Sequence, residues 1–166
     1  MDQDRVKALR AYDVLDTPSE PEFDALVSKA ARIVGAPIAL ISFVDEHRQW
    51  FKARVGLDVE ETPIASSFCT HAIRGKGVFT VKDATRDERF ATNPLVTGDP
   101  GIRFYAGVPL QAANGQRIGT LCVIDRQVRP ALTQDEQRGL SNLAGEVMAL
   151  MEARRAHRKP PRGPDW

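Results

Sequence analysis

The sequence is short of several features that would assign a function directly. Only two of its 166 residues are cysteine, Cys69 and Cys122, too few for a disulfide framework in a chain this long. No run of about 18 apolar residues exists, so no transmembrane helix is predicted. The first ten residues, MDQDRVKALR, are charged from the second position onward and do not read as a secretory signal. We therefore expect both thiols to be reduced in the cytoplasm.

The charge balance assigns no partner either. Lys and Arg total 23 against 22 for Asp and Glu, so the bulk charge favours neither nucleic acid nor a membrane surface. No helical nucleic-acid motif or basic-aromatic stripe is present. Basic residues do gather near the C-terminus, at Arg154, Arg155, Arg158, Lys159 and Arg162. Such an end is typical of a solvated linker, and residues 156–166 are expected to form a disordered, proline-rich tail.

Apolar periodicity predicts the first half of the chain. Apolar residues recur at three- and four-residue spacing from Phe23 to Val34 and predict a helix that ends at Gly35, after a shorter helix around residues 6–15. The run PIALISFVD, 37–45, is almost continuously apolar, as in a strand buried on both faces. The segment that follows it suits the second strand of a hairpin.

The second half begins with a predicted short helix, SSFCTHAIRG at 66–75, which Ser66 or Ser67 can cap. A strand, VFTVKDA, and an irregular segment with one helical turn at 88–91 follow. Asn114-Gly115 predicts a type I′ hairpin turn between two apolar runs. Thr133 is expected to cap a long helix with a heptad seam at Leu140, Leu143, Val147 and Leu150.

This order predicts an α+β fold with a central antiparallel sheet. The strands at 37–45 and 117–125 are apolar on both faces. One face can take the helices, whereas the other must be covered by the long irregular connections. A sheet roofed by long loops commonly encloses a cavity.

Three residues raise the question of a metal or thiol site. Cys69, His71 and Cys122 could supply three zinc ligands, but no CxxC or HxxxH spacing supports them. Positions i and i+2 of a helix point about 200° apart, so Cys69 and His71 cannot face each other if 66–75 is helical. In an extended segment they would share a face, about 6–7 Å apart at Cα. The alternative is a buried cysteine and a histidine satisfied by a backbone carbonyl, and we favour it.

Other catalytic patterns are weaker still. The carboxylates of Asp83, Asp87 and Glu88 fit a turn in which Asp83 bonds its own backbone amides. The segments GDPG and ANGQRIG have neither the lysine of a phosphate-binding loop nor a helix directly after them. The sequence therefore predicts a non-enzymatic protein, with no metal site.

Six motifs follow one another along the chain: LDTPSEPEFDAL, PIALISFVDEHRQWFKARVGL, ETP, SFCTHAI, VKDATRDERFATNPLVTGDPGIRFYAGVPL and GTLCVID. This ordered set resembles the GAF domain, a small-ligand-sensing module of bacterial signalling proteins, and the likeness covers residues 3–155. The chain is most similar to the subgroup attached to histidine kinases and diguanylate cyclases.

The resemblance implies about six antiparallel strands, terminal helices on one face, and a ligand pocket on the other face under segments 66–75 and 83–101. Its candidate ligand-binding residues are Trp50, Cys69, His71, Asp83, Phe90, Arg103, Tyr105 and Cys122. It also implies self-association through the terminal helices, with the seam at Leu140, Leu143, Val147 and Leu150, and a kinase or cyclase as output partner.

Differences from specialised GAF relatives argue against several known ligands, and the cofactor stays unidentified. The Asn-Lys-Phe-Asp-Glu signature of cyclic-nucleotide binders is absent, and Thr70 interrupts the Cys-His pair that attaches a bilin. A haem would have His71 as its ligand. Relatives that reduce methionine sulfoxide need closely spaced cysteines, whereas here 122 − 69 = 53 positions separate the two. The hypotheses are thus a sensor of an unidentified small molecule, a dimerisation scaffold with a filled pocket, or a thiol redox enzyme using Cys69.

Overall fold

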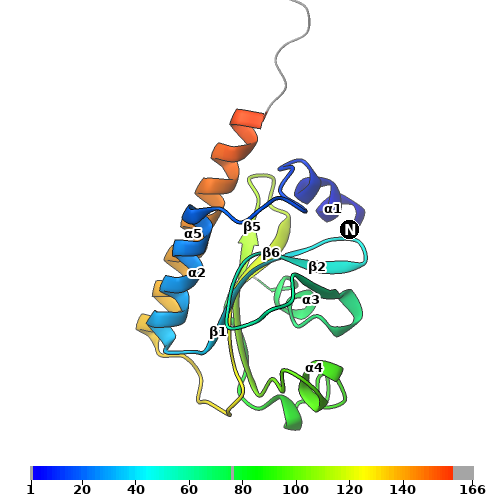
Figure 1. Cartoon of the computed structure of the whole chain (residues 1–166), viewed down its shortest axis with the longest axis vertical. Coiled ribbons are helices and arrows are strands. Elements are labelled where there is room, and N and C mark those ends of the chain that lie inside the picture. Colours follow the sequence, from blue (N-terminus) through cyan, green and yellow to red (C-terminus); the bar gives the residue numbers. More distant parts are fainter. Residues whose placement is uncertain (1, 76, 159–166) are drawn as a thin grey trace, which may run out of the picture.

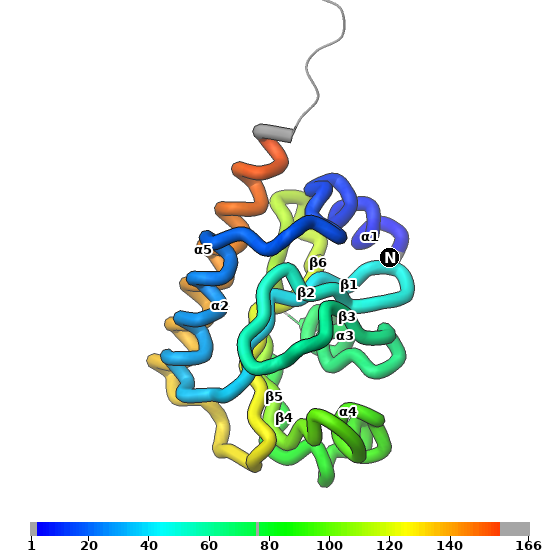
Figure 2. The backbone as a smooth tube through the Cα atoms, in the orientation of Figure 1, coloured from blue at the N-terminus to red at the C-terminus, as the bar shows by residue number. Residues whose placement is uncertain are grey.

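The computed structural model describes residues 2–75 and 77–158, and these form a six-stranded antiparallel sheet with helices on both faces (Figures 1 and 2). The strand order is β3-β2-β1-β6-β5-β4. The strands are β1 (Ile38–Val44), β2 (Arg48–Val55), β3 (Glu61–Pro63), β4 (Phe79–Val81), β5 (Phe104–Gln111) and β6 (Arg117–Asp125). The helices are α1 (Asp2–Arg10), α2 (Pro21–Val34), α3 (Cys69–Ala72), α4 (Pro94–Thr97) and α5 (Gln134–Arg158), with 3₁₀ turns η1 (Ile64–Ser66) and η2 (Ala84–Arg86). The predicted α+β class is confirmed.

The two long helices, α2 and α5, lie together on one face of the sheet (Figure 1). Pro21 starts α2. Proline is tolerated there because an amide in the first turn of a helix has no acceptor within the helix. Gly35 ends it in a left-handed conformation, φ 70°, with its amide donating to Ala31 O at 2.8 Å. At the start of α5, Thr133 and Glu136 each accept a hydrogen bond from the other's amide, at 3.1 and 2.9 Å, and form a capping box.

The heptad seam of α5 is used inside the chain. Leu140, Leu143 and Val147 are buried, and Leu150 is half-buried, in the core that α5 shares with α2 and the sheet. The periodicity predicted from the sequence is present, but its first three members are not available to a second copy in this arrangement. Self-association through them stays a prediction, and intramolecular packing already accounts for their spacing.

Two separate cores explain why the central strands are apolar on both faces. All seven residues of β1 are buried. On β6, Leu121 and Val123 face the helices, whereas Thr120 and Cys122 face the opposite side, where α3, α4 and their connections cover the sheet. We call these coverings, residues 64–75 and 83–102, the roof.

Three local predictions need correction. The β5–β6 turn is not type I′, since Asn114 is absent from the non-glycine residues with positive φ and Gly115 alone is left-handed, at 89°. The amide of Gly115 donates to Ala112 O at 2.9 Å, as in a turn followed by a bulge, and Asn114 Oδ1 accepts from the Gln116 amide at 3.1 Å.

The other two corrections concern lengths. The predicted helix at 66–75 shrinks to α3, because Ser66 belongs to η1 while Ser67 Oγ accepts from the Thr70 amide at 3.2 Å. The helical turn predicted at 88–91 is present, with the Ala91 amide donating to Asp87 O at 2.8 Å, and a further turn, α4, follows, where Asn93 Oδ1 accepts from the Leu95 amide at 2.8 Å. At the C-terminus α5 continues to Arg158, so only 159–166 of the predicted tail lies outside the described residues.

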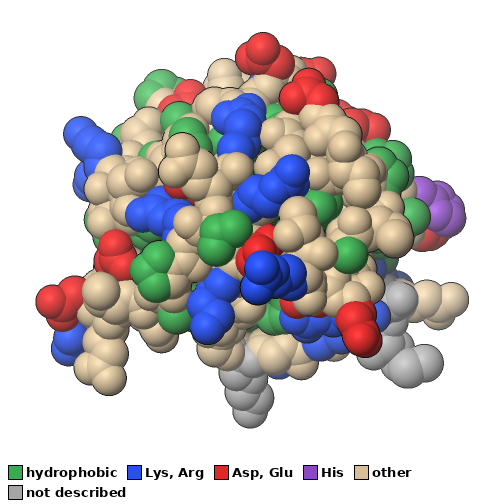
Figure 3. All heavy atoms as spheres, turned by 90° about the horizontal axis from the view of Figure 1, so that it is seen from below, with side chains coloured by type: hydrophobic (Ala, Val, Ile, Leu, Met, Phe, Trp, Pro, Cys, Tyr) green, Lys and Arg blue, Asp and Glu red, His purple; other side chains and the backbone are tan. Residues whose placement is uncertain are grey.

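An ion cluster joins β2, the chain before α2, and α5. The wholly buried ammonium of Lys52 donates to Thr17 Oγ1 at 2.9 Å, to Pro18 O at 2.6 Å and to Glu20 Oε2 at 2.5 Å. The same carboxylate accepts from Arg154 Nη1 on α5 at 2.7 Å. The face seen from below shows Lys and Arg side chains among Asp and Glu (Figure 3). None of the described helices is long and apolar enough to span a bilayer.

Candidate functional site between the sheet and its roof

The space beneath the roof is almost filled by side chains. Phe68 and Phe90 stack with their ring centroids 4.1 Å apart and nearly parallel planes, and Tyr105 lies 5.1 Å from Phe68. Phe79 packs edge-on to Phe90 and Tyr105, at 6.3 and 6.1 Å. A cavity of about 20 Å³ remains, room for one water-sized molecule. The pocket expected over the sheet is therefore closed.

Thiols and hydroxyls meet at the floor of this core. The thiol of Cys69, on α3, lies 2.9 Å from Thr120 Oγ1 on β6 and 3.3 Å from the Tyr105 hydroxyl on β5. Cys122, on β6, lines the same small cavity as Cys69 and Tyr105. We call Cys69, Tyr105, Thr120 and Cys122 the thiol–hydroxyl cluster. Two cysteines that are far apart in sequence are thus neighbours in space.

A glycine makes room for this arrangement. Gly107 pairs with Cys122 across β5 and β6. A Cβ at Gly107 would lie 2.6 Å from the Tyr105 hydroxyl oxygen, closer than the atoms tolerate. The absence of a side chain at Gly107 lets the phenol lie flat across its own strand toward the cysteines.

A second buried polar group adjoins the cluster. Gln49 Oε1 accepts from Ser67 Oγ at 2.7 Å and from Ser42 Oγ at 3.3 Å, while Gln49 Nε2 donates to Thr62 Oγ1 at 2.6 Å. Gln49 and Thr62 also line the small cavity beside Cys69. Buried polar side chains are stable only when they are paired, and this network pairs them from β1, β2, β3 and the roof.

The cluster separates the acidities of its members. Burial opposes ionisation of Cys69, but hydrogen bonds from Cys122, Ser42, Thr120 and Tyr105 outweigh it and lower the pKa of that thiol to about 6. Burial and the neighbouring Cys69 raise the pKa of Cys122 well above its ordinary value. The two opposite pKa shifts have one cause: Cys69 ionises first, and its negative charge then opposes ionisation of Cys122.

His71 lies apart from this chemistry. Its ring contacts Phe90 edge-on at 4.9 Å and Phe79 at 6.3 Å, on the outer side of the aromatic stack. Partial burial, and then the charges of Arg74 and Arg89, lower the pKa of His71, so the imidazole is neutral at pH 7. The helical geometry of α3 thus separates Cys69 from His71, in agreement with the sequence prediction. Among the residues that the structure describes, no cluster of three or more potential ligands could hold a metal.

The structure divides the predicted ligand-binding residues into four groups. Cys69, Tyr105 and Cys122 line the small cavity, and Phe90 and His71 belong to the aromatic stack above it. Asp83 and Arg103 build the roof instead of lining the cavity. Trp50 is buried in the helix-side core, so the prediction that it lines the pocket beneath the roof is wrong.

The two roof-building residues act on backbone groups. Asp83 Oδ1 accepts from the Thr85 amide at 3.1 Å and starts η2. Arg103 Nη1 donates to Val96 O at 2.9 Å and to Ile102 O at 3.1 Å, and so ties α4 down. Sequence reasoning missed Ser42, Gln49 and Thr120. The alternation of Thr120, Cys122 and Ile124 along β6 was the available signal for a polar group on that face.

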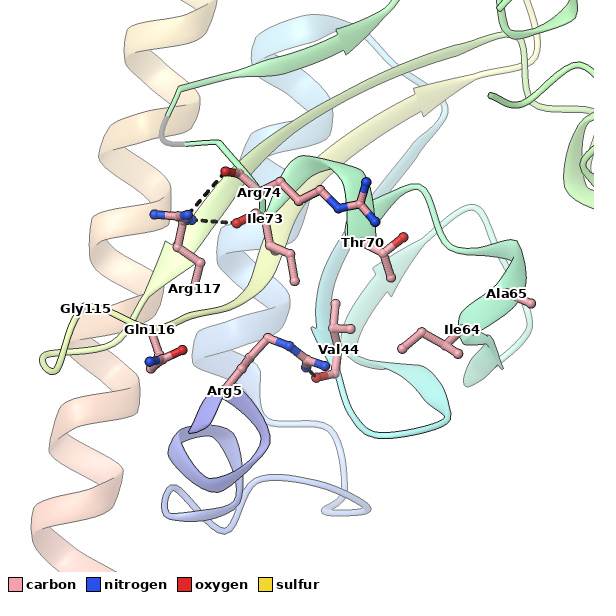
Figure 4. Close-up of a pocket in the computed structure, with 10 residues that line it drawn as sticks. All are labelled: Arg5, Val44, Ile64, Ala65, Thr70, Ile73, Arg74, Gly115, Gln116 and Arg117. Carbon is pink, nitrogen blue, oxygen red and sulfur yellow. Dashed lines mark hydrogen bonds between the residues drawn. The ribbon is translucent and has the colours of Figure 1, made fainter. Parts of the chain in front are cut away.

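Arginines hold the outer end of the roof. Arg117 on β6 donates from Nε to Ile73 O at 2.5 Å and from Nη2 to Arg74 O at 3.2 Å, satisfying carbonyls just after α3 (Figure 4). Arg5 on α1 reaches Val44 O across the same open groove of about 770 Å³. Its lining contains Arg5, Arg74 and Arg117 and no carboxylate. The Arg117 guanidinium thus ties the end of α3 to the sheet.

Both tyrosines of the chain, Tyr12 and Tyr105, are expected to resist alkaline titration. Burial, followed by a hydrogen bond to Glu152, raises the pKa of Tyr12 to about 12, and burial raises that of Tyr105 well above 10.0. A raised phenol pKa stabilises the fold below pH 10, and this contribution is lost as the pH rises through the folded-state value.

Ultraviolet phenolate absorbance of the native protein should therefore stay flat near pH 10 and rise only at about pH 12, together with unfolding. The urea-unfolded chain is the control and should titrate near pH 10. Reversible ionisation of either tyrosine near pH 10 in the folded protein would contradict the buried placement.

Comparison with known proteins places this geometry in a family. The profile of the GAF domain family matches residues 19–151. A cyclic di-GMP phosphodiesterase of Pseudomonas aeruginosa is 47% identical over 143 residues, which are 86% of this chain and 24% of that protein. The chain thus spans about a quarter of the length of this relative.

Solved structures share the fold at low identity. The GAF domain of a phosphoenolpyruvate-protein phosphotransferase from Coxiella burnetii has a TM-score of 0.67 and 16% identity, covering 94% of this chain and 97% of its own. A free methionine-R-sulfoxide reductase from Neisseria meningitidis, solved with its substrate, has a TM-score of 0.65 and 17% identity, covering 90% and 89%.

Proposed function

The chain belongs to the GAF domain family, and we propose that it is a non-enzymatic sensory module of a bacterial signalling protein that binds a small molecule beneath its roof. The observation that carries the proposal is the thiol–hydroxyl cluster, which gathers Cys69, Tyr105 and Thr120 from the roof and two strands. Ligand sites are mostly apolar with a few convergent polar groups, and the roof-side core has this composition.

Binding of anything larger than water requires the roof to move. The Phe68–Phe90 stack occupies the space above the cluster. Helix α3 is a single turn and lies outside the hydrogen-bonded sheet, so it can move without breaking the pairing of the strands. A ligand controls such a protein only if it binds the open and closed forms with different affinity. Displacement of the stack supplies that difference, since the ligand would occupy the space of the two rings.

Strand β6 connects the roof-side core to the core that holds α5. Thr120 and Cys122 face the roof, whereas their neighbours Leu121 and Val123 pack against the helices. Movement of β6 would therefore act on the core that holds α5. The 47% identity to a cyclic di-GMP phosphodiesterase supports cyclic di-GMP turnover as the output that an attached or associated domain performs.

A ligand screen should distinguish this function from its alternative. We expect one compound, among nucleotides, tetrapyrroles, amino acids and methionine-R-sulfoxide, to raise the midpoint of thermal unfolding without being turned over. Thr120→Val should then weaken its binding about fivefold, because one buried hydrogen bond is worth about 1 kcal/mol. Thr97→Val, on the exposed side of α4, is the matched control and should leave the affinity unchanged.

The closed cavity favours a second candidate, a scaffold whose interior is permanently filled. At about 20 Å³ the cavity holds no metabolite as it stands. If no compound in the screen shifts the unfolding midpoint and roof amides exchange as slowly as those of β1 and β6, the scaffold is the better description. Self-association would then use the exposed faces of α2 and α5.

A further inference from the structure

Cys69 and Cys122 form a pair whose chemistry needs no ligand. Both thiols are free, both line the same enclosed cavity, and they are 2% and 0% exposed. Cys69 belongs to the roof and Cys122 to the sheet, so a bond between them would fasten one layer to the other. This inference stands on the thiols alone and goes beyond the proposed sensing of a small molecule.

We propose that Cys69 and Cys122 are a modification site at which a peroxide oxidises the two thiols to a disulfide that ties α3 to β6. The geometry that carries this is the small cavity that both cysteines line, with the hydroxyls of Tyr105 and Thr120 beside Cys69. Thr120 and Cys122 are alternate residues on one face of β6, and Cys69 Sγ lies 2.9 Å from the Thr120 hydroxyl. Cys69 therefore lies over the stretch of β6 that carries Cys122, on the same side of the sheet.

The two thiols are suited to different steps. Hydroxyls of Thr120 and Tyr105 lie within hydrogen-bonding distance of Cys69, and such donors favour the thiolate, which is the form that attacks a peroxide. Burial keeps Cys122 protonated until its neighbour has reacted. Cys69 is therefore the attacking thiol and Cys122 the resolving one.

The chemistry balances with a peroxide as the only oxidant. The Cys69 thiolate attacks one oxygen of hydrogen peroxide, the O–O bond breaks, and a sulfenic acid forms while the departing hydroxide takes up a proton to become water. The Cys122 sulfur then attacks the Cys69 sulfur, an S–S bond forms, the S–O bond breaks, and hydroxide leaves with the Cys122 proton as a second water. Two thiols lose two electrons, and one peroxide becomes two waters.

The approach of the oxidant explains why the roof matters. The cavity has room for one water-sized molecule, so peroxide enters as the roof opens locally around α3. Once formed, the disulfide would hold α3 against β6 and oppose the opening that larger ligands require. Oxidation would thus lock the site closed.

The test treats the folded chain with stoichiometric hydrogen peroxide and follows thiol titre and intact mass. We expect both thiols to disappear together, a mass lower by two hydrogens, and one intrachain bridge between the Cys69 and Cys122 peptides. Reduction should restore both thiols. In Cys122→Ser, Cys69 should stop at a sulfenic acid that dimedone traps, and Cys122→Ala repeats the experiment if the serine variant folds poorly.

Several outcomes would overturn the proposal. These are two thiols that survive the peroxide, a bridge that forms only between chains, or further oxidation of Cys69 in the parent chain without recruitment of Cys122. A Cys69→Ser variant in which Cys122 reacts as fast as Cys69 does in the parent would also overturn the assigned roles. None of these measurements includes a ligand, so failure of the sensory proposal leaves them intact.

Discussion

Leu143→Lys is expected to unfold the protein, with little relation to whether two copies associate. Leu143 is 5% exposed and lies where α5 packs on the helix-side core. Replacing a buried leucine loses about 2–5 kcal/mol of packing, and a buried ammonium without a partner adds several more. The sum is comparable to the whole stability of an ordinary domain, about 5–15 kcal/mol. Circular dichroism should show loss of the cooperative thermal transition.

The neighbouring Asn142→Lys is the matched control. Asn142 is exposed on the other side of α5, so its replacement should change the free energy of unfolding by less than about 0.5 kcal/mol. A Leu143→Lys protein that keeps its unfolding midpoint but sediments as a smaller species would contradict this prediction. That result would mean that the seam joins two chains and that α5 leaves its own core to do so.

Glu20→Gln is expected to cost about 2 kcal/mol of stability. The substitution removes the carboxylate that faces the wholly buried Lys52 ammonium and Arg154. Loss of one partner of a buried pair strands the other charge and costs about 3–5 kcal/mol, but Glu20 is about one-third exposed and solvent screening reduces the figure. Thr17 and Pro18 still accept from Lys52, which also softens the loss. Urea unfolding measures the difference.

The same substitution should have a distinctive pH dependence. Burial opposes ionisation of Glu20, but Lys52 and Arg154 outweigh it and lower the pKa of that carboxyl. Its contribution to stability is therefore present above pH 4.5, the ordinary value, and disappears as the pH falls through the lowered folded value. The difference between parent and Glu20→Gln should shrink as the pH falls into that acid range.

Glu60→Gln provides the comparison for this series, because Glu60 is an exposed carboxylate. It should change stability by less than about 0.5 kcal/mol at every pH. If Glu20→Gln behaves like Glu60→Gln at neutral pH, the ion cluster contributes nothing and Lys52 is satisfied by Thr17 and Pro18 alone. In that case α5 is held by apolar packing without help from Arg154.

Local patterns predicted the elements well where one residue decides the backbone. Gly35 and the Thr133–Glu136 pair end and start helices through bonds to residues at most four positions away, so the sequence shows them directly. The Asn114-Gly115 turn was predicted with the wrong type. Two turn types accept the same dipeptide, and the hydrogen bonds of Asn114 and Gly115 selected between them.

The candidate site was only partly visible. The resemblance assigns Cys69, Tyr105 and Cys122 to one pocket, and these three do line one cavity, whereas Trp50, assigned to the same pocket, lies on the other side of the sheet. A strand buried on both faces carries no alternation of polar and apolar residues, so the face that each side chain takes cannot be read from the pattern. Ser42 and Gln49 were missed for the same reason, whereas the alternate positions of Thr120 and Cys122 on β6 were a signal for a polar group on that face.

The α+β class, the order of the longer helices and strands, and the apolar stripe of α5 can all be predicted from the sequence. They follow from local periodicity and from the chemistry of caps and turns. Burial of the stripe within one chain, closure of the roof, and the placing of Cys69 and Cys122 around one cavity depend on how the elements pack. The two cysteines are 53 positions apart in the sequence, and this separation does not say how far apart they lie in space. They line one cavity because β5 pairs with β6 and α3 packs on these strands.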